Sequence, residues 1–188
     1  MSLATPTASP EVSVLVPAKD EAENLPEFVH QAREALLPLP YPCEVVIVND
    51  GSQDRSGDVL RQLAEKHAFL RVVTHRGQRG IADALKSAAE AARGQVLVFY
   101  PADLQYLPAD IPSLVAPVLA GEADLVTGVK QGRYEKRVVS WVYNRLCRWL
   151  FGVGVTDLNS VKAYRREVMD ALPARPDWHR FMVIIAAA

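Results

Sequence analysis

The chain has 188 residues, of which 49% are hydrophobic and 23% are charged, proportions that are ordinary for a single globular domain. Its formal net charge of −1 excludes a general electrostatic attraction to nucleic acid, so no nucleic-acid partner is expected. The two cysteines, Cys43 and Cys147, lie far apart in the sequence, which disfavours a disulfide scaffold and leads us to expect a cytoplasmic protein. The sequence contains no run of 18 apolar residues, so no membrane span is predicted.

Short apolar runs alternate with amphipathic stretches between residues 12 and 127. Strands are predicted where apolar residues follow one another directly, and helices where they recur every three or four positions. The predicted strands are 12–16, 45–48, 70–74, 96–100 and 125–127, and the predicted helices are 24–37, 56–67, 81–93 and 111–120. Strands that alternate with helices form a mostly parallel sheet with helices on both faces, so the sequence predicts an α/β fold.

The two ends of the chain depart from this alternation. Residues 1–10 are rich in Ser, Thr, Pro and Ala and lack the blocks of a signal peptide, which predicts a disordered leader. Residues 11–188 are predicted to form one domain, whose second half begins near residue 130. The apolar run 181–188 has no stop signal, so we expect the domain to continue beyond it.

Charge is unevenly distributed along the chain. Residues 11–50 carry a local charge of −6, and residues 130–148 carry a local charge of +5. A basic segment of this kind favours an anionic substrate, although helix faces that differ in sign by chance are the alternative. A helix that begins near Arg137 has an apolar face with two tryptophans, which indicates either contact with a membrane surface or ordinary core packing.

Polar residues follow three of the predicted strands directly. These are Lys19–Glu21 after the first strand, Asn49–Ser52 after the second, and Asp103–Gln105 after the fourth. Ligands of open α/β sheets bind at the carboxyl ends of the strands, so we expect these three turns to converge. Asp103, helped by the amide oxygen of Gln105, is the candidate ligand of a divalent ion that bridges a diphosphate. The alternative is that Asp50 and Asp103 are ordinary turn residues.

Several familiar catalytic and phosphate-binding motifs are absent from the sequence. It contains no GxGxxG, no GxxxxGK[ST], no GxSxG and no HExxH. Dinucleotide binding, P-loop chemistry, α/β-hydrolase chemistry and zincin chemistry are therefore disfavoured. An acidic edge without a glycine-rich cradle agrees better with a metal-bridged diphosphate.

Five segments resemble the motifs of family 2 glycosyltransferases with the GT-A fold, and they occur in the family's order. VLVPAKDEAENL resembles the family's opening "IPTYNEAENI", IVNDGSQD resembles "IVDDGSxD", and ADLQYLP resembles "DADLQHPP". RGIADA is similar to "GxGxA", and VTDLNSVKAYRR is similar to "VSDxxSGFRxYRR". Within the family, the resemblance points to the dolichyl- and polyprenyl-phosphate sugar transferases.

This resemblance implies an enzyme, an inverting transferase that moves a hexose from a UDP- or GDP-sugar to polyprenyl or dolichyl phosphate. It implies Mg²⁺ or Mn²⁺ as cofactor and a location in the cytoplasm at the inner face of the membrane. The implied donor-binding residues are Pro17, Glu21, Val48, Asp50 and Lys130. The implied metal ligands are Asp103 and Gln105. The implied catalytic residues are Asp103, Lys136 and Ser140, of which the last two would grip the acceptor phosphate.

The sequence departs from the family's pattern at the metal and in the opening motif. Pro101 stands where the family has its first metal-binding aspartate, and Lys19 and Asp20 replace a tyrosine and an asparagine. Because losing a carboxylate weakens a divalent-ion site, two alternatives stay open. One is a family 2 enzyme with a polysaccharide or small hydroxyl acceptor, and the other is a catalytically impaired nucleotide-binding module.

Overall fold

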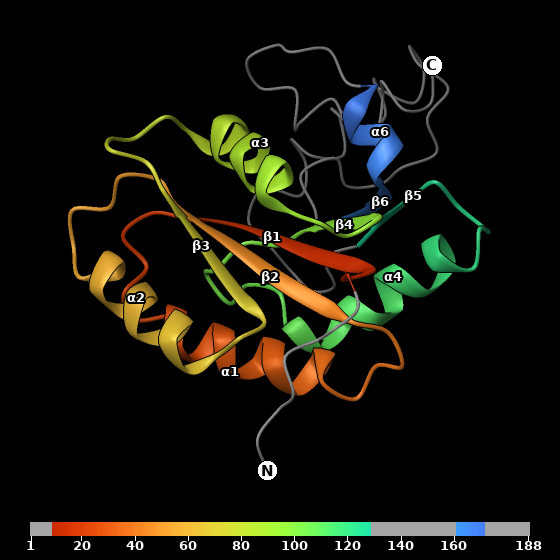
Figure 1. The fold of residues 1–188 in the computed structure, drawn as a ribbon, viewed down its shortest axis with the longest axis horizontal. Coiled ribbons are helices and arrows are strands. Elements are labelled where there is room, and N and C mark those ends of the chain that lie inside the picture. Colours follow the sequence, from red (N-terminus) through yellow and green to blue (C-terminus); the bar gives the residue numbers. More distant parts are fainter. Residues whose placement is uncertain (1–8, 129–160, 172–188) are drawn as a thin grey trace, which may run out of the picture.

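A single six-stranded sheet forms the centre of the computed structural model, which describes residues 9–128 and 161–171 (Figure 1). Its strand order is β3-β2-β1-β4-β6-β5. The strands are β1 (Val12–Ala18), β2 (Cys43–Asn49), β3 (Leu70–Thr74), β4 (Val96–Phe99), β5 (Leu125–Thr127) and β6 (Lys162–Arg165). The first four are mutually parallel, and β6 runs antiparallel to both β4 and β5.

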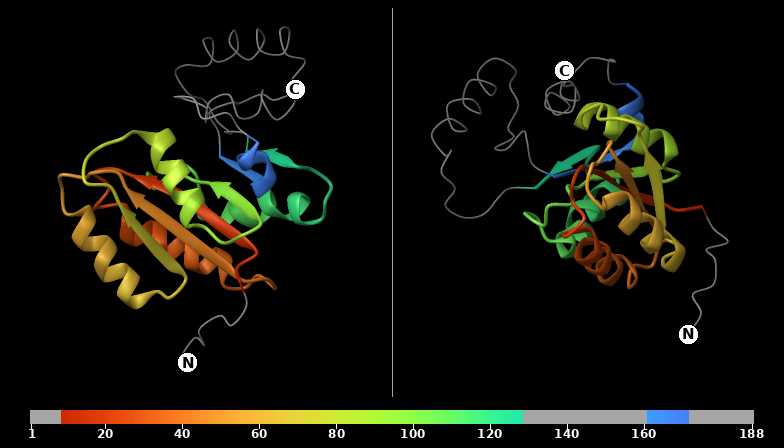
Figure 2. Two further views of the ribbon diagram at one scale, coloured as in Figure 1. Left: turned by 45° about the horizontal axis from the view of Figure 1, so that its top comes forward. Right: turned by 90° about the vertical axis from the view of Figure 1, so that its left-hand side faces the viewer.

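Helices cover both faces of this sheet (Figures 1 and 2). One face carries α1 (Leu25–Leu36), α2 (Ser56–Lys66) and α4 (Ile111–Leu119), which follows the short 3₁₀ helix η1 (Pro108–Asp110). The opposite face carries α3 (Ile81–Ala91) and α6 (Arg166–Asp170). The fold is therefore the α/β arrangement that the alternation of strands and helices predicts.

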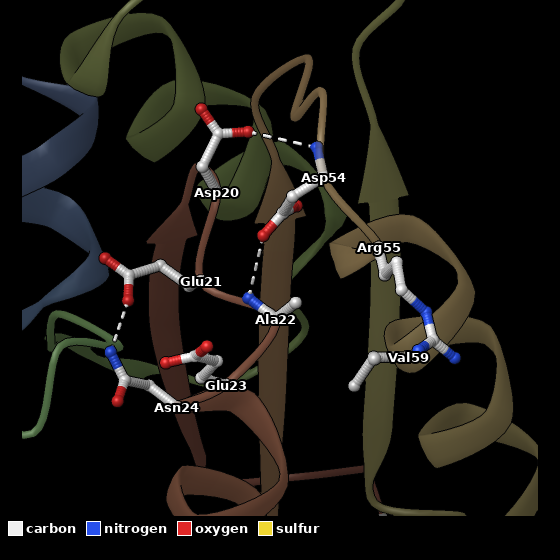
Figure 3. Close-up of a pocket in the computed structure, with 8 residues that line it drawn as sticks. All are labelled: Asp20, Glu21, Ala22, Glu23, Asn24, Asp54, Arg55 and Val59. Carbon is white, nitrogen blue, oxygen red and sulfur yellow. Dashed lines mark hydrogen bonds between the residues drawn. The ribbon is translucent and has the colours of Figure 1, made fainter.

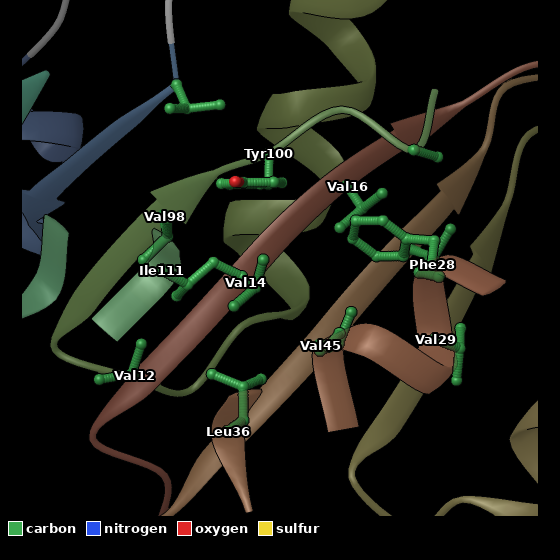
Figure 4. Close-up of a cluster of buried hydrophobic side chains, with 14 of the residues drawn as sticks. Val12, Val14, Val16, Phe28, Val29, Leu36, Val45, Val98, Tyr100 and Ile111 are labelled. Atoms are coloured by element: carbon green, nitrogen blue, oxygen red, sulfur yellow. The ribbon is translucent and has the colours of Figure 1, made fainter. Parts of the chain in front are cut away.

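The central strands are apolar along their whole length because each face of the sheet has its own core. On the α1 side, alternate residues of β1 such as Val14 and Val16 lie in one buried cluster with Phe28 and Tyr100 (Figure 4). The intervening Leu15 packs instead into the cluster beneath α3. Burial on both faces thus explains why these strands appear in the sequence as continuous apolar runs.

Arg166 anchors the carboxyl end of α3. Its guanidinium donates from Nε to Gly94 O at 2.9 Å, from Nη2 to Ala92 O at 2.9 Å and from Nη1 to Ala89 O at 3.2 Å. These carbonyls belong to the last turn of the helix and the residues after it, where a cation is favourable. With this end of α3 fixed at the amino edge of the sheet, the helix begins at the opposite, carboxyl edge.

The nine predicted elements between residues 12 and 127 are confirmed, with boundaries that shift by at most two residues. Strand β6 was not predicted, because Lys162 and Arg165 interrupt its apolar pattern, and α6 was missed with it. The predicted leader lies mostly in residues 1–8, and the predicted long helix near Arg137 lies in residues 129–160; both segments are outside the described residues. None of the helices in the described part is long and apolar enough to cross a bilayer.

Candidate active site

The turns that follow β1, β2 and β4 lie at one edge of the sheet, as expected from the sequence. Asp50 N donates to Ala18 O at 2.9 Å, so the turn after β2 lies directly beside the end of β1. On the other side of β1, Tyr100 N donates to Leu15 O at 3.0 Å, which places the turn after β4 at the same edge. The turns that carry Glu21, Asp50 and Asp103 thus share one edge of the sheet.

The turns after β1 and β2 are interlocked by their side chains (Figure 3). Asp20 Oδ1 accepts a hydrogen bond from Gln53 N at 2.7 Å, and Ser52 Oγ accepts one from Asp20 N at 2.9 Å. In the same direction as the bond to Ser52, Asp54 Oδ2 accepts a hydrogen bond from Ala22 N at 3.1 Å. These reciprocal bonds hold the two turns as one unit.

Asp20 has a backbone conformation that explains why this position takes an Asp or an Asn. Its φ of 56° lies in the left-handed region, which Asp and Asn tolerate better than most residues. Its carboxylate also pairs with the Lys19 ammonium. The hydrogen bond from Lys19, followed by that from Gln53 N, lowers the pKa of Asp20. The charge of Lys19 is therefore directed at its neighbour.

An open pocket of about 560 Å³ lies beside these interlocked turns (Figure 3). Its lining comes from the β1–α1 turn, the β2–α2 turn and the first turns of α2, and consists of Asp20, Glu21, Ala22, Glu23, Asn24, Asp54, Arg55 and Val59. Of the predicted site residues, Glu21 lines this pocket, whereas Asp50 and Asp103 do not. The Glu21 carboxylate is oriented by Asn24 Nδ2, which donates to Glu21 Oε2 at 2.7 Å.

Asp50 binds the β3–α3 loop through its carboxylate. Oδ1 accepts hydrogen bonds from His75 Nδ1 at 2.7 Å and from Arg79 N at 2.8 Å, and Oδ2 accepts one from Gly80 N at 2.8 Å. Burial by itself raises the pKa of Asp50, but the hydrogen bonds from His75, Arg79 and Gly80 outweigh it and lower the pKa. Asp50 is thus held as an ionised acceptor at the edge of the sheet.

His75 is a further residue of this edge that the sequence patterns did not single out. Its side chain is 5% exposed, and its second ring nitrogen, Nε2, lies 2.9 Å from Ser87 Oγ on α3. The useful signal was its position, because His75 follows β3 directly, as Asp50 follows β2. The rule that identified the acidic turns applies equally to this residue.

Asp103 lies in a tight turn that follows β4. Asp103 Oδ1 accepts a hydrogen bond from Gln105 N at 3.1 Å, and the intervening Leu104 has a φ of 58°. Tyr100 Oη anchors the far side of this loop by donating to Leu107 O at 2.6 Å. Asp103 is half-buried and Gln105 is exposed.

The donor set of this turn agrees with a divalent ion that takes most of its ligands from substrate and water. No group of three or more His, Cys, Asp or Glu side chains within residues 9–128 and 161–171 is arranged to hold a metal ion by itself. Mg²⁺ and Mn²⁺ prefer oxygen ligands, and Mg²⁺ commonly uses one or two carboxylates together with phosphate oxygens and water. One carboxylate and one amide oxygen meet that requirement.

The remaining predicted site residues lie within strands β1 and β2 or outside the described residues. Pro17 and Val48 are paired across β1 and β2. Val48 is completely buried beneath α3, so any effect on a ligand passes through the turn that follows it. Lys130, Lys136 and Ser140 are outside the described residues, and their roles stay predictions.

The sheet order, with one antiparallel strand among parallel ones and an acidic turn after β4, defines a GT-A glycosyltransferase fold. The model of the family described as Glycosyl transferase family 2 matches residues 13–173, and the chain belongs to that family.

Two curated relatives have a polyprenyl phosphate in their names. The chain is 33% identical over 181 residues to the undecaprenyl-phosphate 4-deoxy-4-formamido-L-arabinose transferase of Pseudomonas savastanoi pv. phaseolicola, covering 93% of this chain and 53% of that protein. It is 30% identical over 183 residues to the dodecaprenyl-phosphate galacturonate synthase of Rhizobium johnstonii, covering 94% of this chain and 54% of that protein. The chain thus spans about half the length of these relatives.

Two solved structures that resemble this chain contain a nucleotide or a nucleotide sugar. A mannosyltransferase from Pyrobaculum calidifontis in complex with GDP-Man and Mn²⁺ is 25% identical, with a TM-score of 0.64, covering 91% of this chain and 49% of that one. Glucosyl-3-phosphoglycerate synthase from Mycobacterium tuberculosis in complex with UDP is 24% identical, with a TM-score of 0.70, covering 92% of this chain and 64% of that one. The second likeness supports the fold alone.

Proposed function

We propose that this chain is the donor-binding and catalytic domain of an inverting transferase that moves a sugar from a nucleotide-diphosphate sugar to polyprenyl phosphate. The observation that carries the proposal is the common edge at which Asp50, held as an ionised acceptor, and the Asp103 turn flank the end of β1. Support for the acceptor comes from the relatives, whose names specify undecaprenyl and dodecaprenyl phosphate.

The donor nucleoside is proposed to lie beside β1 and β2. Asp50 accepts a hydrogen bond from the base, UDP or GDP being the donor nucleotide, while Pro17 and Glu21 contact the nucleoside and Val48 supports the turn behind it. Lys130 is proposed to contact the donor from the basic segment. Because Asp50 is already ionised and fixed by three donors, its hydrogen bond to the base needs no reorganisation.

The donor diphosphate is proposed to lie over the Asp103 turn. Asp103 and Gln105 would hold Mg²⁺ or Mn²⁺ there, and such an ion would supply positive charge beside the leaving diphosphate. The tight turn between Asp103 and Gln105 fixes the direction of the carboxylate, and the bond from Tyr100 to Leu107 restrains the loop behind it.

The transfer itself depends on alignment more than on proton transfer. A phosphate oxygen of the lipid attacks the anomeric carbon and forms the new C–O bond, while the bond from that carbon to the β-phosphate breaks and the nucleoside diphosphate leaves. A lipid phosphate is ionised near neutral pH, so it needs no strong general base. We assign its alignment to Lys136 and Ser140, within the basic segment 130–148.

The lipid acceptor implies peripheral contact of the domain with a membrane surface, which we propose for the same basic segment. Anionic lipid headgroups attract clustered Lys and Arg side chains. The proposal places the enzyme at the cytoplasmic face of a membrane, where nucleotide sugars and lipid phosphates meet.

A product assay tests the proposed function. The protein is incubated with Mn²⁺ or Mg²⁺, a panel of UDP- and GDP-sugars, and a short polyprenyl phosphate in detergent, and the lipid fraction is analysed by mass spectrometry. We expect a polyprenyl-phosphate sugar with at least one donor, and loss of that product with Asp103→Asn. Transfer to a hydroxyl compound in place of the lipid phosphate contradicts the proposed acceptor. Folded protein that makes no product with any donor contradicts the proposal as a whole.

A further inference from the structure

The Asp50 carboxylate, on a side chain that is 6% exposed, has one acceptor position that no described residue fills. An ionised carboxylate offers about four lone-pair positions, two on each oxygen. Oδ1 already accepts from His75 Nδ1 at 2.7 Å and from Arg79 N at 2.8 Å, so it is filled. Oδ2 accepts from Gly80 N at 2.8 Å and keeps one position open. No other hydrogen bond to this carboxylate occurs within residues 9–128 and 161–171.

His75 is fixed in the orientation that fills Oδ1. Because an ionised carboxylate can only accept, His75 Nδ1 must carry the proton of this hydrogen bond. The far side of the ring is held by Ser87 Oγ on helix α3, 2.9 Å from Nε2. The backbone is held as well, since His75 N donates to Asn49 O at 2.9 Å, one residue before Asp50.

We propose that His75 is a specificity-determining positioning residue of the donor site, which limits Asp50 to one open acceptor position and thereby favours a uracil base over guanine. The inference rests on the proposed function and specifies its donor as a uridine-diphosphate sugar. His75 acts through Asp50 and has no direct role in the chemistry of transfer.

Uracil and guanine differ in the number of N–H groups that they can donate to a carboxylate. Uracil presents a single N–H, at N3, between two carbonyl groups, and one acceptor position satisfies it. Guanine presents the N1–H and the exocyclic amino group side by side, and it pairs with a carboxylate through both oxygens. With Oδ1 filled by His75, one guanine donor loses its partner on binding, and an unpaired donor in a buried contact is costly.

Replacing His75 with Asn or with Gln distinguishes the roles of the two ring nitrogens, because each amide places a nitrogen near only one of them. In His75→Asn the amide nitrogen lies near the position of Nδ1 and can still donate to Asp50 Oδ1. In His75→Gln it lies near the position of Nε2, towards Ser87, and leaves Oδ1 with only the Arg79 bond. His30→Gln, an exposed histidine on α1, is the matched control.

The test is calorimetric titration of each purified protein with UDP and with GDP, in the presence of Mn²⁺. We expect the wild-type protein to prefer UDP by roughly tenfold or more, the cost of one unpaired donor. His75→Asn and His30→Gln keep this ratio within about twofold, whereas His75→Gln loses most of it through tighter GDP binding. A merely structural role for His75 would weaken both nucleotides equally and leave the ratio unchanged.

The remaining outcomes distinguish failure of the inference about His75 from failure of the proposed function. His75→Gln protein that melts like the wild type and keeps the UDP preference overturns the inference, as does wild-type protein that prefers GDP. If His75→Gln does not fold, Ser87→Ala replaces it, because it frees the ring from α3. We expect Ser87→Ala to reduce the preference by roughly threefold, and an unchanged ratio overturns the inference. Folded wild-type protein that binds neither nucleotide contradicts the proposed function instead.

Discussion

Gly51 lies against Gly77 so closely that a β-carbon on Gly51 would stand 2.4 Å from the Gly77 carbonyl carbon. Gly51 also has a φ of 66°, in the left-handed region. This contact brings the turn after β2 against the β3–α3 loop, and it lets Asp50 reach the backbone of Arg79 and Gly80. The glycine of the Asn-Asp-Gly-Ser motif is therefore required by the close packing of these two loops.

Replacing Gly51 with alanine is expected to destabilise the protein by about 2–5 kcal/mol, through left-handed strain together with a clash against backbone atoms. Urea denaturation followed by circular dichroism measures the change in the free energy of unfolding. Gly77→Ala is the matched control, since its β-carbon would meet nothing within 4 Å, and we expect a change below about 1 kcal/mol. Equal effects of the two substitutions would contradict the asymmetry of this contact.

Tyr164 on β6 carries a buried hydroxyl that has no hydrogen-bond partner among the described residues. Its burial raises the pKa of the phenol. Tyr164→Phe removes the unpaired hydroxyl and keeps the ring, so we expect the free energy of unfolding to stay the same or to rise by about 1 kcal/mol. Thermal and urea unfolding measure this change.

Tyr100→Phe gives the opposite expectation and serves as the comparison. Tyr100 Oη donates to Leu107 O at 2.6 Å, and removal of that bond is expected to lower stability by about 1 kcal/mol. A large loss of stability in Tyr164→Phe would show that the hydroxyl has a partner in the folded protein.

Asp50 makes stability depend on pH in a definite direction. Its pKa in the folded protein lies below the ordinary value of 3.8, so the folded state binds the proton less readily than the unfolded state. Its contribution is therefore fully present above the unfolded pKa and is lost as the pH falls through the folded pKa. We expect Asp50→Asn to cost about 2–3 kcal/mol at pH 7, with a difference from the wild type that narrows below about pH 4.

Unfolding free energies measured from pH 3 to pH 7 test this pH dependence. Asp83→Asn is a suitable control, because Asp83 is an exposed residue whose pairing with Arg79 at 3.4 Å is worth at most about 0.5 kcal/mol. If the difference between Asp50→Asn and the wild type stays constant over this range, the carboxylate is not the group that titrates.

The proposed metal site predicts one substitution that weakens metal-dependent binding and one that strengthens it. Asp103→Asn removes the one carboxylate of the turn after β4, and we expect it to weaken Mn²⁺-dependent UDP binding at least about tenfold while leaving binding in EDTA unchanged. Pro101→Asp supplies the carboxylate that the family has at this position, and we expect it to tighten Mn²⁺-dependent binding by about tenfold.

Titrations with UDP, with Mn²⁺ and with EDTA, measure these changes. Asp110→Asn, an exposed acid at the end of η1, is the control for a change of charge nearby. Insensitivity of UDP binding to Asp103→Asn in the presence of Mn²⁺ would exclude Asp103 as a ligand.

The sequence predicts the sheet and its edge well because both depend on local patterns. Apolar runs such as Val45–Val48 mark strands that are buried on two faces, and the carboxyl-edge rule identifies Asp50 and Asp103. Strand β6 is not recognisable from apolar runs because it begins with a charged residue, Lys162, that is nevertheless buried. Lys162 is 2% exposed, and its ammonium lies 5.7 Å from the centre of the Phe99 ring.

The hydrogen-bond network around Asp50 could not be predicted from the sequence in the same way. The partners of Asp50 are His75 and the backbone of Arg79 and Gly80, which lie 25 to 30 residues further along the chain. No spacing rule links an aspartate to a histidine across a helix and a strand. Such contacts depend on the close approach at Gly51, and hence on the folded arrangement of the two loops.

A crystal structure of this protein with UDP and Mn²⁺ is the most direct test of the shared edge as a donor site. We expect the uracil N3 to lie within hydrogen-bonding distance of Asp50 Oδ2, and the diphosphate to meet Mn²⁺ at Asp103. A nucleotide bound elsewhere, for example in the pocket between Glu23 and Val59 with Asp50 and Asp103 untouched, would contradict the proposed site.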